Sequence, residues 1–235
     1  MISLDVATDR LLHKASYRKA FLDGDYALLE LQPEDLAALL PLDREQLIET
    51  AEAVRRSLLE RKHRGSGGIQ ATYPETLSAW LEREGDADMT QFADRFMESA
   101  AFDAYHEVPH SGDGLSLEEA TFRFFESEEV GDPSTREREF LAGLCKALAL
   151  NTEPAFTVGD PLRQVPSGWY AVSRHEPVSL FAALDGNYVQ GELTPFLADL
   201  LTSGRTAEQV GEQHGVPPSV VDAATAKLEA LGLVL

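Results

Sequence analysis

The fold of the C-terminal part of this chain is decided by the stretch Val178-Ser-Leu-Phe-Ala-Ala-Leu184, Asp185-Gly186, Asn187-Tyr-Val-Gln-Gly-Glu-Leu193. Two apolar runs flank an Asp-Gly pair, which is a strong signal for a two-residue turn because both turn positions need a positive φ. The stretch therefore predicts a β-hairpin, and we expect its second strand to span Asn187 to Glu192.

The segments around this hairpin complete a small unit. Before it, Gly168-Trp-Tyr-Ala-Val-Ser-Arg174 has the β-branched and aromatic character of a strand. After it, helix signals predict three helices: from Thr194-Pro195 to Leu201, from Ser203 to Val210, and from Gly215-Val-Pro-Pro218 to about Leu231. Three strands followed by three helices predict a winged-helix module, and such modules usually bind an extended polymer.

The charge of the chain argues against DNA as that polymer. There are 20 Lys and Arg residues against 40 Asp and Glu residues, a formal net charge of −20. Affinity for a duplex depends on basic side chains that neutralise phosphates. The last helix carries Asp222, Lys227 and Glu229 but no arginine. A winged-helix transcriptional regulator therefore stays as an alternative, and a helix that packs against protein is the preferred interpretation.

The first 150 residues predict a domain of helices joined by short loops. Leu4, Leu11, Ala15 and Leu22 mark a first helix that ends near Gly24, and the clearest helix follows Asp43. Further on, Ser116-Leu-Glu-Glu119 predicts a capping box. Pro and Gly become frequent beyond Asn151. We expect an α+β protein with a helical domain over residues 1–150 and the winged-helix module over residues 151–235.

Composition indicates a folded protein of the cytoplasm. The chain is 43% hydrophobic, and it has neither a run of about 20 apolar residues that would span a membrane nor a signal-peptide pattern at Met1. The single cysteine, Cys145, lies among apolar neighbours on a predicted helix, which excludes an internal disulfide and favours a core position over a nucleophile.

A basic strip lies at the end of the clearest helix. Cations near a helix C-terminus are favoured simply because the last carbonyls are unpaired. The strip also has the charge needed to receive an acidic peptide or partner. Its members are Arg55, Arg56, Arg61, Lys62 and Arg64.

The segment His106-Glu-Val-Pro-His110 is the strongest candidate for a metal site in the sequence. A helical pair of ligands needs two histidines four residues apart on one face, but Pro109 breaks the helix before His110. A metal enzyme using His106 and His110 is therefore an alternative only. We expect no catalytic residue and no metal or other cofactor in this chain.

The C-terminal unit resembles the PqqD-like recognition elements that bind leader peptides of ribosomally made, post-translationally modified peptides (RiPPs). The resemblance covers roughly residues 168 to 235 and rests on Leu184-Asp-Gly186, Leu193-Thr-Pro195, Gly204-Arg-Thr206-Ala-Glu-Gln-Val210 and the closing Leu228-Glu-Ala-Leu-Gly-Leu-Val. Thr194 stands where the family usually has asparagine.

The whole chain is similar to accessory subunits of multinuclear non-haem iron oxidative enzymes, on Leu31-Gln-Pro-Glu-Asp-Leu36 and Tyr73-Pro-Glu-Thr76 in the helical half. Enzymes of this class act in methanobactin and 3-thiaglutamate biosynthesis. The resemblance implies a heterodimer in which the partner enzyme holds the iron, while this chain recruits the precursor peptide and binds neither nucleic acid nor membrane.

The resemblance also implies where the leader peptide docks: it adds a strand to the sheet edge, beside the last helix. If the N–H of Val189 faces outward, proline there would block this addition. Val220, Ala224 and Leu228 also have the spacing of a core face, so part of the site would be core instead. The expected site is Asn187, Tyr188, Val189 and Gln190 on the strand with Val220, Val221, Ala224, Lys227 and Leu228 on the helix.

Overall fold

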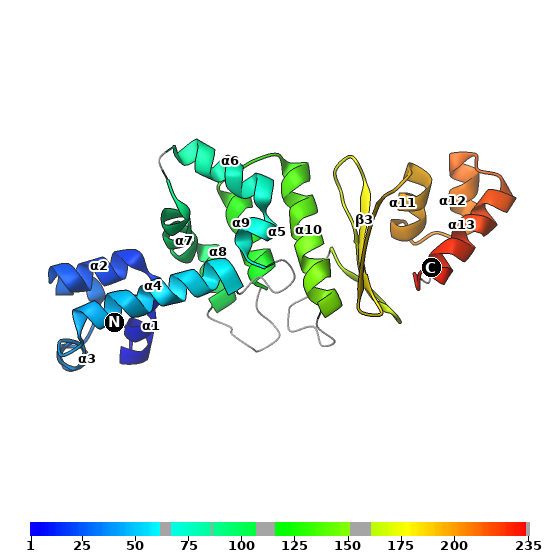
Figure 1. Ribbon diagram of the computed structural model, residues 1–235. Helices are drawn as coiled ribbons and strands as arrows, with labels where there is room; N and C mark the ends of the chain where they lie inside the picture. Colours follow the sequence, from blue (N-terminus) through cyan, green and yellow to red (C-terminus); the bar gives the residue numbers. More distant parts are fainter. Residues whose placement is uncertain (62–66, 86, 107–115, 151–160, 234–235) are drawn as a thin grey trace.

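The computed structural model describes residues 1–61, 67–85, 87–106, 116–150 and 161–233, without the side chain of Arg61. Figure 1 shows an elongated arrangement in which N-terminal helices lie at one end, an antiparallel sheet follows the middle helices, and three helices form the other end. The predicted α+β class is confirmed. No helix among the described residues is long and apolar enough to cross a membrane.

The N-terminal helices enclose a core of their own around Leu11, Phe21 and Leu29. The predicted first helix is two helices, because Lys14 adopts an extended conformation (φ −100°, ψ 109°) between them. The Lys14 ammonium group donates to the carbonyl of Met97 and pairs with Asp103, both far along the chain. The elements are α1 (Leu4–His13), α2 (Ala15–Asp23), η1 (Tyr26–Leu29), α3 (Pro33–Leu39) and α4 (Arg44–Arg61).

The middle helices surround a core rich in aromatic rings. Phe92 lies at its centre, with ring centroids 5.2 Å from Trp80 and 5.8 Å from Phe124 in edge-to-face geometry, an arrangement that aromatic quadrupoles favour. These helices are α5 (Ile69–Thr72), α6 (Pro74–Glu84), α7 (Met89–Met97), α8 (Ala100–His106), α9 (Leu117–Ser127) and α10 (Pro133–Leu150).

The predicted capping box before α9 is half formed. The Ser116 hydroxyl accepts a hydrogen bond from the Glu119 amide at 3.0 Å. The Glu119 carboxylate instead pairs with Arg123, one turn further along the helix, at 2.6 Å. A second capping box, between Asp88 and Gln91, is complete at the start of α7.

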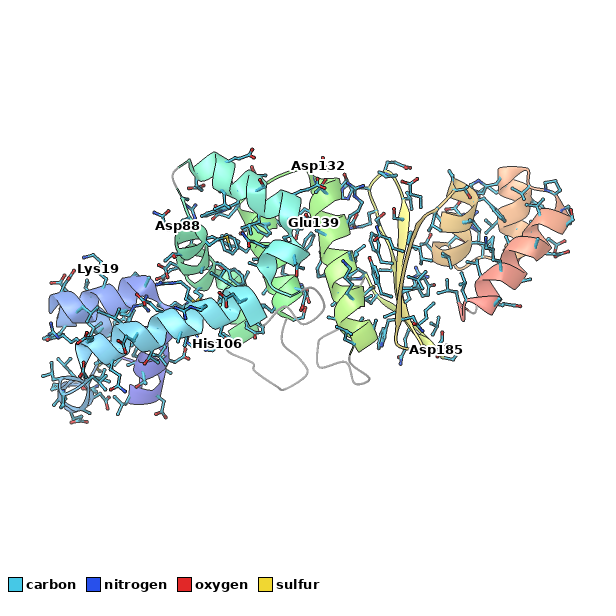
Figure 2. All side chains as sticks on the ribbon, viewed as in Figure 1. Lys19, Asp88, His106, Asp132, Glu139 and Asp185 are labelled. Carbon is cyan, nitrogen blue, oxygen red and sulfur yellow. The ribbon has the colours of Figure 1, made fainter. Side chains whose placement is uncertain are left out.

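The sheet has four antiparallel strands in the order β1-β2-β3-β4, one more than predicted. The Asp-Gly turn is confirmed, with φ of 50° at Asp185 and 76° at Gly186; Figure 2 labels Asp185 at this end of the sheet. The additional strand is the three-residue β1, which pairs with β2. The strands are β1 (Arg163–Val165), β2 (Gly168–Val172), β3 (Ser179–Leu184) and β4 (Asn187–Glu192).

Both faces of the sheet are covered, so every residue of β3 is buried. Phe181 and Ala183 belong to the aromatic core, to which α10 also contributes. Leu180, Ala182 and Leu184 face the opposite way and belong to the C-terminal core, as the two-residue period of a strand requires. Figure 1 shows this arrangement, with α10 on one side of the sheet and the C-terminal helices on the other.

The C-terminal helices are α11 (Pro195–Thr202), α12 (Ala207–His214) and α13 (Pro218–Ala230). Thr194 caps α11 by accepting from the amide of Leu197, a role for which threonine is one of the preferred residues. A capping box of Thr206 and Gln209 begins α12. The predicted division into domains at residue 150 stays a prediction; α10, which ends there, packs against the sheet.

Candidate peptide-binding edge

Strand β4 forms one edge of the sheet and has the bounds that the sequence predicts, Asn187–Glu192. Among the described residues it pairs only with β3. Edge strands present backbone N–H and C=O groups without a strand partner, and such groups bind added strands. The edge is therefore suited to main-chain recognition of a peptide.

The register of the hairpin determines which backbone groups face outward. Residues of an antiparallel pair alternate between bonding to the partner strand and pointing away from it. The amide of Leu193 donates to the carbonyl of Val178 at 2.8 Å, and Val189 is opposite Ala182 in the same register. Hence Val189 bonds to β3, whereas the N–H and C=O groups of Tyr188, Gln190 and Glu192 point outward. The outward orientation that we considered for the Val189 N–H is wrong.

The side chains of β4 contribute to two different walls. Tyr188 faces α10, where the Lys146 ammonium group lies 5.4 Å from the centre of its ring. The Tyr188 hydroxyl donates to Gln190 Oε1 at 2.7 Å. Burial raises the pKa of Tyr188 to about 12, so the hydroxyl remains a donor at neutral pH. Val189 points to the other side and packs against the C-terminal core, while Asn187 is exposed.

On α13 the predicted residues divide into core and surface. Val221 and Leu228 are buried in the C-terminal core, and Ala224 packs against it. Lys227 is exposed, and so is Val220, with half of its surface accessible. The alternative prediction of a core face formed by Val220, Ala224 and Leu228 is therefore wrong for Val220, which is exposed, and confirmed for Leu228.

The reason lies on the neighbouring helix. A Cβ atom at Gly211 would come within 2.5 Å of the Val221 side chain. The glycine thus leaves the space that Val221 occupies, and Val221 rather than Val220 packs into the C-terminal core beside Leu228.

The basic strip is only partly available to a partner. Arg55 pairs with Asp94 at 2.8 Å, and its side chain is 15% exposed. Arg56 is exposed. The side chain of Arg61, together with Lys62 and Arg64, lies outside the described residues, so binding of an acidic partner at the strip stays a prediction.

His106 ends α8, and its Nε2 atom lies 2.8 Å from Asp9 Oδ1 on α1. His110 lies outside the described residues, so the predicted pair is not seen together. The sequence interpretation missed Asp9 and His13, although their spacing of four residues on a predicted helix places them on one face.

A buried carboxylate was also missed. Glu137 on α10 accepts hydrogen bonds from the Arg174 side chain at 2.7 Å and from His175 Nδ1 at 2.8 Å, and it lines a cavity of ≈ 540 Å³. Burial alone would raise the pKa of the Glu137 carboxyl, but these hydrogen bonds hold it below its ordinary value. Arg174 and His175 follow β2, so their hydrogen bonds to the Glu137 carboxylate join α10 to the end of that strand.

Comparison with protein-family models, with curated proteins and with solved structures found no match to this chain. The function is therefore inferred from the geometry of the chain, and the inference starts from the edge strand β4.

Proposed function

We propose that this chain is a non-catalytic accessory subunit that binds the leader of a ribosomal precursor peptide and presents it to a partner enzyme, a multinuclear non-haem iron oxidative enzyme of RiPP biosynthesis. The observation that carries the proposal is β4, an edge strand whose outward N–H and C=O groups belong to Tyr188, Gln190 and Glu192. A leader peptide would pair with these groups.

The order of elements supports a PqqD-like winged-helix module in residues 161–233. Strands come first and three helices follow, with α11 and α12 capped by threonine side chains. In the proposed mode the leader lies along β4 as a fifth strand. Backbone pairing supplies affinity, and side-chain contacts on the two faces supply register.

The two walls beside β4 suggest which side chains of the leader are recognised. Successive residues of an added strand point to opposite faces. One set would meet Tyr188 and Lys146 on the α10 side, and the other would meet Val189 on the side of the C-terminal core. A leader that alternates an acidic or aromatic residue with an aliphatic one fits both walls.

The N-terminal helices are the proposed surface for the partner enzyme. A specific complex buries about 1,600 Å² in total, and the fully buried centre of such an interface is more apolar than the rest of the protein surface. Most exposed large hydrophobic residues of the described chain belong to this end: Met1, Val6, Leu28, Leu40, Leu42 and Ile48. Co-expression with the partner should raise the yield of both chains, and separate elution of the two proteins at micromolar concentration would contradict the heterodimer.

Fluorescence polarisation tests the peptide-binding proposal. The probe is a fluorescein-labelled synthetic peptide with the sequence of the short reading frame that we expect beside this gene. Saturable binding to the full chain, lost with a scrambled peptide of the same composition, supports the proposal. Equal affinity for the scrambled peptide would contradict it, and tight binding of a DNA duplex at low salt would favour the transcriptional regulator instead.

A further inference from the structure

Two histidines and an aspartate from distant parts of the chain meet where the N-terminal helices join the aromatic core. Asp9 and His13 lie on α1, and His106 is the last residue of α8. Figure 2 shows His106 between the N-terminal helices and the helices of the aromatic core. One potential ligand atom from each side chain lies within 4.8 Å of the other two.

The distances between these atoms fit a common cation. Asp9 Oδ1 is 2.8 Å from His106 Nε2 and 3.1 Å from His13 Nδ1. Ligands bound tetrahedrally at 2.0–2.1 Å lie about 3.3 Å from one another. His13 Nδ1 also lies 3.0 Å from the backbone carbonyl oxygen of Asp9, a contact that it would give up to bind an ion. The three ligand atoms would move apart by a few tenths of an ångström, about the difference between these distances and the tetrahedral separation. Two imidazoles and one carboxylate also form a ligand set that zinc and similar divalent transition metals accept.

The surroundings hold the two imidazoles in place. The His106 ring stacks on the buried Phe102 ring with centroids 5.3 Å apart, and it lies 4.3 Å from the His13 ring. The His13 side chain is 13% exposed and that of His106 is 29% exposed. The nearby Lys14 ammonium group is paired with Asp103, so its charge is compensated.

Other histidines of the described residues lack this arrangement. His214 pairs with Asp199 at 2.8 Å, and His175 pairs with Glu137 at 2.8 Å. Each of these is a single imidazole beside one carboxylate. Within the described ranges, only the Asp9 group brings three potential ligands together.

We propose that Asp9, His13 and His106 form a binding site for one divalent transition-metal ion of the zinc type. The ion would join α1 to α8 and thereby hold the N-terminal helices against the aromatic core. With three protein ligands, the fourth position of the ion would take water or a ligand from another molecule. This site is separate from the peptide-binding edge and does not depend on the proposed function.

Calorimetric titration of the full chain with ZnCl₂ tests the site, using protein without a histidine tag that has been stripped with a chelator. We expect one equivalent to bind and the melting temperature to rise, because an ion that binds the folded state stabilises it. Asp9→Asn and His106→Gln should each weaken binding by at least about 100-fold, because loss of even an outer-shell partner of a metal ligand costs about 10- to 100-fold. His214→Gln, which removes a histidine from a single pair, should bind as the parent does.

Circular dichroism establishes that each variant is folded. If His106→Gln fails to fold, Asp9→Asn still tests the site, because the asparagine side chain has nearly the size and shape of aspartate. Co²⁺ provides an independent readout, since its visible absorption reports its ligands. A parent spectrum that Asp9→Asn abolishes supports the site. Two results would overturn the proposal. One is a Kd of the parent protein for zinc weaker than about 100 µM. The other is equal zinc affinity in the parent and in Asp9→Asn.

Discussion

Proline at position 190 should block peptide binding while the protein stays folded. The register directs the Gln190 N–H away from β3, so Gln190→Pro removes a donor from the open edge and leaves the bonds between β3 and β4 in place. Proline is tolerated at such positions of edge strands. Proline at Val189 would instead remove a bond within the hairpin and is a test of folding.

The size of the effect follows from the lost hydrogen bond. A peptide carbonyl that loses its partner costs about 1–3 kcal/mol when it stays buried. This free energy corresponds to an increase in Kd of about 5- to 150-fold. Steric contact between the proline ring and the added strand acts in the same direction.

Two matched variants identify the cause. Gln190→Ala removes the side chain that accepts from the Tyr188 hydroxyl but keeps the N–H, and we expect less than about a 5-fold change, typical of one modest hydrogen bond. Gln164→Pro makes the same change on β1, where the register also directs the amide outward, and it should bind as the parent does. Fluorescence polarisation measures all three. A folded Gln190→Pro variant with the parent Kd would refute the placement of the peptide on β4, and a loss with Gln164→Pro alone would move the site to β1.

Three further predictions concern stability and reactivity. Gly168→Ala should lower the free energy of unfolding by at least about 2 kcal/mol, because φ is +146° and a Cβ atom would lie 2.0 Å from the Ala183 carbonyl oxygen; urea unfolding measures this, and an unchanged midpoint would contradict it. Glu137→Gln should cost about 2 kcal/mol at pH 7 by weakening the bond from Arg174. Since the folded-state pKa of Glu137 is lowered, this contribution is present above the unfolded pKa of about 4.3 and disappears as the pH falls through the folded pKa. A difference in free energy of unfolding between the parent and Glu137→Gln that stays constant from pH 7 to below 4 would contradict this. Burial raises the pKa of Cys145 to about 12; the thiol should not react with a disulfide reagent at pH 8 until the protein is unfolded, and rapid reaction of the native protein would show that it is accessible.

Features set by neighbouring residues were predictable from the sequence. The Asp185-Gly186 turn and the bounds of β4 depend on local turn chemistry and alternation. Strand β1 was missed because it has only three residues and lies between Pro161 and Pro166. The break at Lys14 depends on contacts with Met97 and Asp103, which no local pattern encodes.

The candidate sites show the same limit. Alternation predicts that β4 is a strand, but its register with β3 decides that Gln190, not Val189, presents an outward N–H. On α13 the close approach of Val221 to Gly211 accompanies the burial of Val221 in place of Val220. His106 and Asp9 are 97 positions apart, so only the packing of α8 against α1 brings them together.

Residue-resolved hydrogen exchange by NMR tests the central claim most directly. In the free protein the amides of Tyr188, Gln190 and Glu192 should exchange quickly, while those of Val189 and Gly191, which bond to β3, are protected. Saturating leader peptide should slow exchange at the three outward amides. Binding of the peptide that leaves these three amides unprotected would contradict recognition at the β4 edge.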